Sequence, residues 1–314
     1  MKVLITGATG FIGRTLCRDL CRDYELIALS RDVRRASSVI GDYAKILEWD
    51  GRTTGTWIKE ADGAYAIINL AGESISQGRW RQSKKAGILH SRLDAIRAII
   101  AAIKQVKERP VVVIQASAVG YYGSTGSEEL NENSPTGKGF LAEVCQKEEL
   151  CAEPVSELGV RLVIIRTGIV LGENGGALPQ LAKPFKYFLG GCPGSGKQWF
   201  SWISLEDEVA AIRFLMETEK LQGVFNLTSP NPVTMKEFYN KLGRALKKPS
   251  WLPVPAFVIR KIFGEMADEM ILSGQRVIPE KLLDAGFEFK YDKVENALDA
   301  MYRGHHARDT KGEV

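Results

Sequence analysis

The sequence predicts an α/β fold, in which a doubly wound parallel β-sheet is followed by a smaller, mostly helical C-terminal domain. Three observations lead to this prediction. Short, continuous Val- and Ile-rich runs alternate with longer amphipathic runs over the first two-thirds of the 314 residues. This alternation is typical of β-α-β units whose sheet is covered on both faces. A glycine-rich turn follows the first apolar run, and after Gly172 the chain becomes rich in glycine and then mostly helical.

Hydrophobic periodicity places the individual elements. The expected strands of the first part are Lys2–Ile5, Glu25–Leu29, Lys45–Glu48, Ala64–Asn69, Val111–Ala116 and Arg161–Arg166. The helices expected between them are Phe11–Arg22, Thr54–Glu60, Ser83–Val106 and Gly139–Leu158. Beyond Gly172 we expect strands at Trp199–Ile203 and Val224–Leu227, and helices at Leu205–Glu217, Thr234–Leu246, Pro255–Phe263, Glu265–Ser273 and Pro279–Ala285. Thr234 is the expected N-cap of its helix, with Glu237 completing a capping box.

Composition excludes several classes of protein. The net charge of +4 comes without a long run of Lys and Arg, so we expect no nucleic-acid partner. Only three histidines occur (His90, His305 and His306), which argues against a His-based catalytic triad and against a metal site. The five cysteines lack a CxxC pair and are expected to be reduced. An N-terminal strand in place of a signal peptide, and no apolar run of membrane-spanning length, predict a cytoplasmic protein with no membrane partner.

The turn after the first strand has the pattern of a phosphate-binding loop. Residues 6–13 read Thr-Gly-Ala-Thr-Gly-Phe-Ile-Gly, a G-x-x-G-x-x-G motif that opens a helix. Gly7 permits the tight turn, Gly10 lets backbone N–H groups approach a pyrophosphate, and Gly13 lets the helix pack close to the strand. Phe11 and Ile12 lie inside the motif at the start of the helix. The alternative is a glycine-rich turn without a ligand, but the strand–turn–helix context favours a dinucleotide.

The end of the second strand favours NADP(H) over NAD(H). An NAD site usually carries an acid there for the ribose 2′-hydroxyl, whereas an NADP site has a nearby Arg for the 2′-phosphate. This chain has Ser30 and Arg31 at that place, with Arg34 and Arg35 following, and Asp32 lies past the usual position of the acid. The alternative is a solvated basic start of a helix.

These motifs resemble those of the extended short-chain dehydrogenase/reductases, the NAD(P)-dependent epimerase/dehydratase superfamily. A narrower resemblance is to its atypical "epimerase family protein" branch. It rests on residues 69–73 (Asn-Leu-Ala-Gly-Glu), 78–80, 91–92, 166–172 and 201–203, and on residues 263–279, which resemble the branch's own C-terminal domain. The resemblance covers the chain to about residue 303.

The resemblance implies further cofactor contacts. It implies that Leu70 and Ala71, with Gly72, line the adenosine side, that Arg92 reaches toward the cofactor, and that Val170 touches the nicotinamide end. The residues themselves add that Arg92 lies in an otherwise apolar helical pattern. A buried guanidinium there requires an anionic partner, unless Arg92 sits at the edge of the helix and faces water.

The usual catalytic dyad of the superfamily is missing. Ordinary members use Tyr-x-x-x-Lys on the fifth helix, where Lys lowers the pKa of Tyr. None of the nine tyrosines in this chain has a lysine four residues later, and Phe140 and Val144 occupy the matching positions. Ser117 remains where the superfamily has its catalytic serine. Tyr121 is the first candidate for a reassigned acid, and Glu73 and Lys85 are alternatives.

Residues 191–197 imitate an ATP-binding P-loop. Gln198 stands where the Mg²⁺-binding Ser or Thr is required, so we expect no ATP site. We expect this loop, with Gln198, Trp199 and Trp202, to line a substrate cleft.

The predicted organisation is a Rossmann-type NADP(H)-binding domain over residues 1–172, completed by parts of 197–228. A substrate or cap region covers 173–196 and 229–303, and a disordered tail 304–314. The predicted function is an epimerase-like oxidoreductase or isomerase acting on an unknown small polar or nucleotide-linked substrate. The alternative is a catalytically inert NADP(H)-sensing protein. A homodimer through the fourth and fifth helices is expected by analogy alone.

Overall fold

The computed structural model describes residues 1–309, which form two compact units. The first unit contains Met1–Tyr121, Ala142–Arg166 and Val209–Phe225. The second contains Tyr122–Leu141, Thr167–Glu208 and the described residues from Asn226 onward. Neither unit is therefore a single stretch of the chain.

The first unit is built on a seven-stranded sheet with the order β12-β7-β5-β4-β1-β2-β3. Its strands are β1 (Lys2–Thr6), β2 (Glu25–Ser30), β3 (Lys45–Glu48), β4 (Ala66–Asn69), β5 (Val112–Ala118), β7 (Arg161–Thr167) and β12 (Gly223–Leu227). The pairings of β1 with β2 and β4, of β2 with β3, and of β4 with β5 are parallel. The predicted doubly wound parallel sheet is therefore confirmed.

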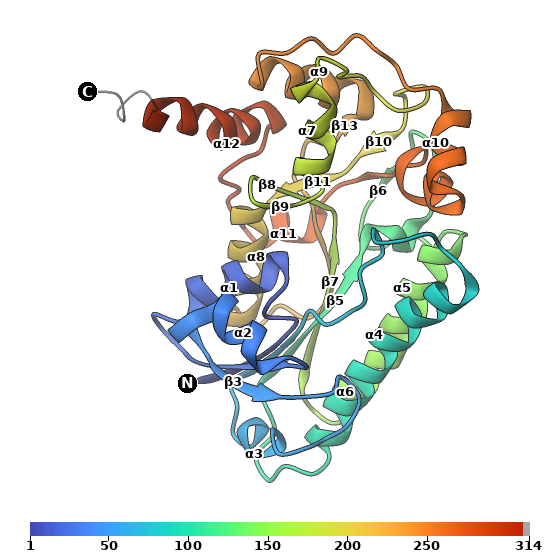
Figure 1. Cartoon of the computed structure of the whole chain (residues 1–314). Coiled ribbons are helices and arrows are strands. Elements are labelled where there is room, and N and C mark those ends of the chain that lie inside the picture. The colour runs from blue at the N-terminus through green and yellow to red at the C-terminus, as the bar shows by residue number, and fades with distance from the viewer. Residues whose placement is uncertain (310–314) are drawn as a thin grey trace. The chain divides into compact units, whose positions relative to one another are not determined.

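Helices cover both faces of this sheet (Figure 1). On one face lie α1 (Phe11–Leu20), α2 (Val33–Ile40) and α8 (Leu205–Glu217), whose first residues, up to Glu208, belong to the second unit. On the other lie α3 (Ile58–Ala61), α4 (Gln82–Ile103), α5 (Phe140–Ala152) and α6 (Pro154–Glu157). The second face buries Ile67 and Val113 of the sheet against Ile96 and Ile99 of α4. The strands read as continuous apolar runs because both of their faces are covered.

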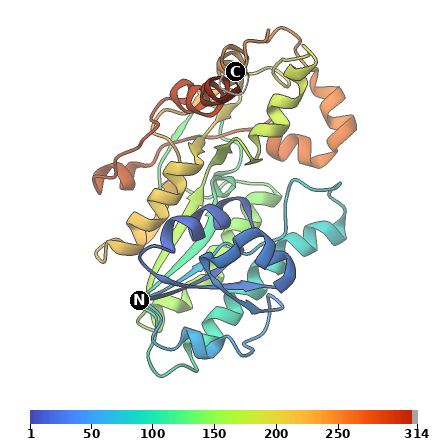
Figure 2. The same ribbon diagram turned by 60° about the vertical axis from the view of Figure 1, so that its left-hand side comes forward.

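The second unit combines short strands with helices (Figure 2). Its strands are β6 (Glu129–Leu130), β8 (Ile169–Gly172), β9 (Gly175–Gly176), β10 (Trp199–Phe200), β11 (Trp202–Ser204), β13 (Val233–Thr234) and β14 (Arg276–Val277). Its helices are α7 (Leu178–Lys186), α9 (Met235–Ala245), α10 (Ala256–Phe263), α11 (Glu280–Asp284), α12 (Val294–Asp309) and a π-helical turn at Ala267–Ile271. Its core joins Trp202 and Phe200 to Phe238 and Leu242 of α9 and to Leu298 of α12.

Helix α9 begins as its sequence predicts. The Thr234 side chain accepts a hydrogen bond from the Glu237 backbone N–H, and the Glu237 carboxylate accepts one from the Thr234 backbone N–H. This reciprocal pair satisfies two N–H groups that have no partner inside the helix. The predicted capping box is confirmed.

Several predicted elements differ in extent. The strand expected at Trp199–Ile203 is two strands in different sheets, β10 and β11. They separate at Ser201, whose hydroxyl donates to the Gln275 carbonyl and accepts from the Val277 N–H. The helix expected at Gly139–Leu158 is likewise two helices, because Pro154 begins α6.

Other elements were not expected from the sequence. Helices α2, α7 and α12 are absent from the predicted elements. Where the sequence predicts a disordered tail over 304–314, the structure has helix α12 as far as Asp309. Residues 310–314 lie outside the described residues.

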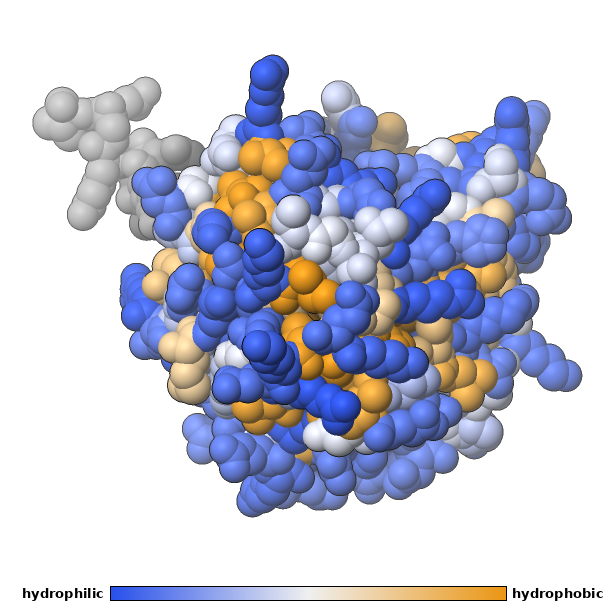
Figure 3. Space-filling model, turned by 90° about the horizontal axis from the view of Figure 1, so that it is seen from below, coloured by the Kyte–Doolittle hydropathy of each residue, from blue (hydrophilic) through white to orange (hydrophobic). Residues whose placement is uncertain are grey.

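The surface is mixed in polarity. On the face shown in Figure 3, hydrophobic side chains appear between hydrophilic ones instead of forming one unbroken area. Single exposed apolar residues of this kind are normal on protein surfaces. Among the described residues, no helix is both long enough and apolar enough to cross a membrane.

Candidate functional site

The glycine-rich turn brings three segments of the first unit into close contact. Gly7 has a φ of +66°, and a Cβ at this position would lie 2.5 Å from the Leu70 carbonyl oxygen in the loop after β4. A Cβ at Gly13 would lie 2.4 Å from the Gly7 carbonyl oxygen. Only glycine fits both positions. The end of β1, the start of α1 and the loop after β4 therefore form one tightly packed edge.

The first turn of α1 is open to an anion. Gly10 is the N-cap residue, and among the described residues no side chain caps this end. The first turn holds no acidic residue, and Phe11 and Ile12, its first two residues, are half-buried. Uncapped N–H groups and the positive end of the helix dipole together favour a bound phosphate or carboxylate.

Of the residues at the end of β2 and just after it, Ser30 and Asp32 form local hydrogen bonds, whereas the arginines have no carboxylate partner among the described residues. The Ser30 hydroxyl donates to the Asp32 carbonyl and accepts from the Asp32 N–H, so it shapes this turn. Asp32 caps α2, because its carboxylate accepts from the Arg35 N–H at 2.9 Å. Arg31, like the two arginines that open α2, is exposed, and no carboxylate of the described residues pairs with it. Exposed guanidinium groups that no carboxylate of the described residues pairs with, beside an Asp32 that is engaged as a helix cap, suit a bound phosphate.

Arg92 points inward. Its Nη1 donates to the carbonyl oxygens of Glu73 at 3.1 Å and Ile88 at 2.9 Å. Its Nε lies 3.6 Å from Oε2 of Glu148. A Cβ at Gly72 would lie 3.0 Å from the guanidinium carbon, so Arg92 packs directly against the loop after β4. The Arg92 side chain is thus engaged by two backbone carbonyls and lies beside the buried Glu148, and it is only partly exposed to water.

A row of buried side chains runs across the sheet to that glutamate. Thr6 is in register with Asn69, and Asn69 with Gln115, on the adjacent strands β1, β4 and β5. Thr6 Oγ1 donates to Asn69 Oδ1 at 2.6 Å, and Asn69 Nδ2 donates to Gln115 Oε1 at 2.7 Å. Gln115 Nε2 donates to Glu148 Oε1 at 2.9 Å. The Ala71 backbone N–H donates to Thr6 Oγ1, so every donor in the row points toward Glu148 of α5.

Glu148 is held as a neutral acid at neutral pH. It is 3% exposed. Burial raises the pKa of Glu148 to about 8, and the neighbouring Glu149 adds to the rise. The Arg92 charge and the Gln115 hydrogen bond oppose the rise without cancelling it. Removing a carboxylate from water is the dominant cause.

The two candidate catalytic residues contact a buried ion pair, which Glu149 forms with Arg166. Ser117 Oγ donates to Glu149 Oε1 at 2.7 Å. Arg166 of β7 binds the same carboxylate through two hydrogen bonds of 2.9 and 2.7 Å. The guanidinium carbon of Arg166 lies 3.4 Å from the ring centroid of Tyr121. The ion pair of Glu149 and Arg166 therefore positions both predicted residues: Glu149 binds Ser117, and Arg166 packs on Tyr121. Neither member of the pair was a predicted site residue.

The residues around these candidates lie as follows. Tyr122, next to Tyr121, is fully buried, and its hydroxyl donates to Asn226 at 2.7 Å. Glu73 pairs with Lys84 at 2.7 Å, and Lys85 lies on α4. Phe140 and Val144, which match the missing dyad, both lie on α5.

Glu269 caps α5 and had no signal in its local sequence. Its two carboxylate oxygens accept from the N–H groups of Phe140 and Leu141, each at 3.2 Å. A Cβ at Gly139 would lie 2.6 Å from this carboxylate. The region after residue 254 therefore fixes the start of the helix that carries Glu148 and Glu149.

The predicted residues of the second unit pair within that unit, and one of them belongs to its core. Val170 lies on β8, paired with Ile203 of β11. Trp202 is fully buried, so it is a core residue. Gln198 donates to the Pro193 and Ile271 carbonyls, each at 3.0 Å.

Trp199 stacks on a cation, since the guanidinium carbon of Arg276 lies 4.9 Å from its ring centroid. Glu208 is also buried in the second unit and accepts from the Thr167 hydroxyl at 2.8 Å. Burial raises the pKa of Glu208 to about 8.

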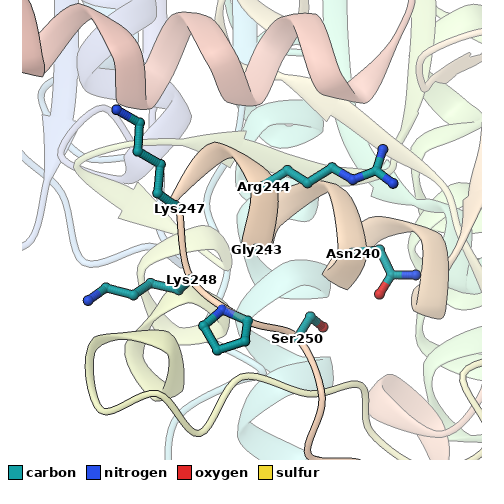
Figure 4. A pocket seen from close by; sticks show the side chains of 7 residues that line it. Asn240, Gly243, Arg244, Lys247, Lys248 and Ser250 are labelled. Carbon is teal, nitrogen blue, oxygen red and sulfur yellow. The ribbon is translucent and has the colours of Figure 1, made fainter.

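A shallow basic pocket of about 390 Å³ lies at the end of α9 (Figure 4). Asn240, Arg244, Lys247, Lys248 and Ser250 are among its lining residues. Cations at the C-terminal end of a helix complement the negative end of its dipole. None of the predicted site residues lines this pocket.

A parallel doubly wound sheet with a glycine-rich turn after its first strand defines the Rossmann-type class of nucleotide-binding folds. The family model described as "NAD dependent epimerase/dehydratase family" matches residues 3–228, and a model described as "Domain of unknown function (DUF1731)" matches residues 254–301. The chain belongs to the NAD dependent epimerase/dehydratase family. The predicted resemblance is confirmed.

Relatives align with almost the whole chain. The Arabidopsis thaliana "Epimerase family protein SDR39U1 homolog, chloroplastic" is 41% identical over 96% of this chain and 86% of its own. The Bacillus subtilis "Epimerase family protein YfhF" is 39% identical over 96% of this chain and 98% of its own. The crystal structure of human epimerase family protein SDR39U1 (isoform 2) with NADPH has a TM-score of 0.87 and 31% identity, covering 96% of this chain and 99% of that one.

Replacing Arg166 with Met tests the buried ion pair. Arg166 is 3% exposed, and its loss would leave the Glu149 carboxylate buried without its countercharge. We expect Arg166→Met to lower the free energy of unfolding by about 3–5 kcal/mol in urea denaturation. The double variant Glu149→Gln/Arg166→Met should recover most of the loss, because it buries no charge.

Lys147→Met is the matched control. Lys147 pairs with Glu143 on the exposed side of α5, where a salt bridge contributes at most about 1 kcal/mol. Equal stability of the single and double Arg166 variants would contradict the assignment.

Proposed function

We propose that the protein is an NADP(H)-binding, epimerase-like oxidoreductase acting on a small polar or nucleotide-linked substrate. The observation that carries the proposal is the close packing of Gly7 and Gly13 against neighbouring backbone, including that of Leu70, which leaves no room for a side chain at either glycine. This packing lies beside the start of α1, which no side chain of the described residues caps. Membership of the NAD dependent epimerase/dehydratase family supports it, as does the NADPH in the human relative's structure.

The residues present fit the cofactor. The start of α1, with Gly10, Phe11, Ile12 and Gly13, suits its pyrophosphate through backbone N–H groups. Arg31, followed by Arg34 and Arg35, suits a 2′-phosphate, beside the turn that the Ser30 hydroxyl shapes, and Asp32 is engaged as a helix cap. Leu70, Ala71 and Gly72 are proposed for the adenosine side, Arg92 as their support, and Val170 for the nicotinamide end.

The proposed chemistry uses Ser117 and Tyr121. NADPH supplies a hydride when bound. Ser117 donates its one hydroxyl hydrogen bond to Glu149. Toward the substrate its oxygen therefore acts as a hydrogen-bond acceptor. Tyr121 has its ring fixed by Arg166, and its phenol is the proton donor to the substrate oxygen. Arg166 thus places its guanidinium against the face of the Tyr121 ring.

A cofactor-sensing protein without turnover is the second candidate. The observation that favours it is the missing Tyr-x-x-x-Lys dyad, with Phe140 and Val144 at the matching positions. Incubation with NADPH and a panel of carbonyl compounds and nucleotide sugars separates the two candidates. Oxidation of NADPH that is lost in Tyr121→Phe supports the enzyme, and inactivity across the whole panel supports the sensor.

Cofactor choice is testable by calorimetric titration with NADPH and NADH. We expect the wild type to prefer NADPH. Arg31→Ala should weaken NADPH binding by about 10- to 100-fold, the range for a lost charge-assisted hydrogen bond, and leave NADH binding unchanged.

Arg18→Ala is the control for Arg31→Ala, since Arg18 is exposed in the last turn of α1, away from the glycine-rich turn. A preference for NADH, or an Arg31→Ala variant that retains the full NADPH preference, would count against the proposal.

A further inference from the structure

We propose that Glu148 is a positioning residue of the cofactor site: it ends the hydrogen-bonded row that fastens the loops after β1 and β4, and when it loses its proton it draws Arg92 away from the loop after β4. The inference rests on the proposed function, because it concerns how the cofactor loops are held. It concerns a residue that contacts neither loop directly. Glu148 acts through two separate connections, both within the first unit.

The first connection is the hydrogen-bonded row. Asn69 ends β4 and Thr6 ends β1, and the Ala71 N–H reaches back to Thr6 Oγ1 at 3.1 Å. The two loops of the cofactor edge are therefore fastened to each other through this threonine. The row has one direction, and its last acceptor is Glu148, which accepts from Gln115 whether its carboxyl is neutral or ionised, so this connection holds in both states. Thr6, Asn69 and Gln115 are fully buried, so water cannot replace a lost partner without entering the core.

The second connection is Arg92. Its guanidinium holds the Glu73 carbonyl, directly after Gly72, while its Nε lies 3.6 Å from Glu148. That distance is longer than a hydrogen bond, so Arg92 is shared between the loop and the acid. An ionised Glu148 would be a buried negative charge, and it would draw the guanidinium toward itself and away from the loop.

The charges around Glu148 agree with this direction. Arg92 is the cation that faces it from α4, and β5 contributes only the uncharged Gln115. On α5 itself, Glu149 opposes ionisation, but its own countercharge is Arg166 of β7. Cys145 faces both acids, and burial raises the pKa of this thiol to about 12, so it stays neutral. The pKa of Glu148 is about 8, so the carboxyl is neutral below that pH and ionised above it. We therefore expect affinity for the cofactor to fall as pH rises through this value.

Titration of the protein with NADPH, followed by its fluorescence, tests the proposal from about pH 7 to about pH 9.5. The second ionisation of a phosphate, near pH 6, is complete over this range, so the ligand does not change charge. We expect the Kd of the wild type to rise by about 5-fold or more, the lower end of typical coupling between two sites. Glu148→Gln keeps the acceptor oxygen without an ionisable proton, and its Kd should stay flat.

Glu208→Gln is the matched control. Glu208 is the other buried acid whose pKa is raised to about 8, but it lies in the second unit. Its variant should keep the pH dependence of the wild type. A flat wild-type curve, or a Glu148→Gln curve that follows the wild type, would overturn the inference.

Hydrogen exchange without cofactor separates this inference from the proposed function. Failure of NADPH to bind at every pH would overturn the proposed function alone. Exchange of the backbone amides of residues 69–73, compared between wild type and Glu148→Gln at the same pH, then decides the inference. We expect equal protection at about pH 6.5 and weaker protection in the wild type at about pH 9. Equal protection at both would overturn the positioning role.

Discussion

The hydrogen-bonded row from Thr6 through Asn69 and Gln115 to Glu148 is the interaction on which the rest of the first unit depends. Each of the three strand residues is in register with the next, so the row exists only when β1, β4 and β5 pair as they do. A slip of one residue would turn every side chain to the opposite face and leave buried amides without partners. The row therefore specifies strand register at the edge where the glycine-rich turn begins.

Helix α5 connects this row to the candidate catalytic residues. Glu148 and Glu149 are consecutive, and both are buried on this helix. Burying a carboxylate costs free energy, and the two residues avoid that cost in different ways. Glu148 keeps its proton, whereas Glu149 is paired with Arg166 through two hydrogen bonds. The first acid ends the row that reaches the loops after β1 and β4, and the second contacts Ser117 directly and Tyr121 through Arg166. The Glu269 cap, from the region matched by the domain of unknown function, fixes the start of this helix.

The sequence predicted local features well because their causes are local. The glycine-rich turn, the Thr234 capping box and helix α8 all follow from residues a few positions apart. The acid network could not be predicted in the same way, because Thr6, Asn69, Gln115 and Glu148 are brought together by the sheet and not by spacing. Arg166, a charged residue near the end of an apolar strand, was, like Arg92 in its apolar helix, a signal that a buried acid lies nearby. Helix α7 was not predicted because it contains Pro184, and a proline inside a segment argues against a helix there.

Infrared difference spectroscopy between wild type and Glu148→Gln tests directly whether Glu148 carries a proton at neutral pH. At about pH 6.5, below a pKa of about 8, we predict a carbonyl band of a protonated carboxyl in the wild type that the variant lacks. Above about pH 9 the band should give way to carboxylate bands. A difference spectrum with only carboxylate bands at about pH 6.5 would contradict the account, because Glu148 would then be an ordinary ion pair with Arg92.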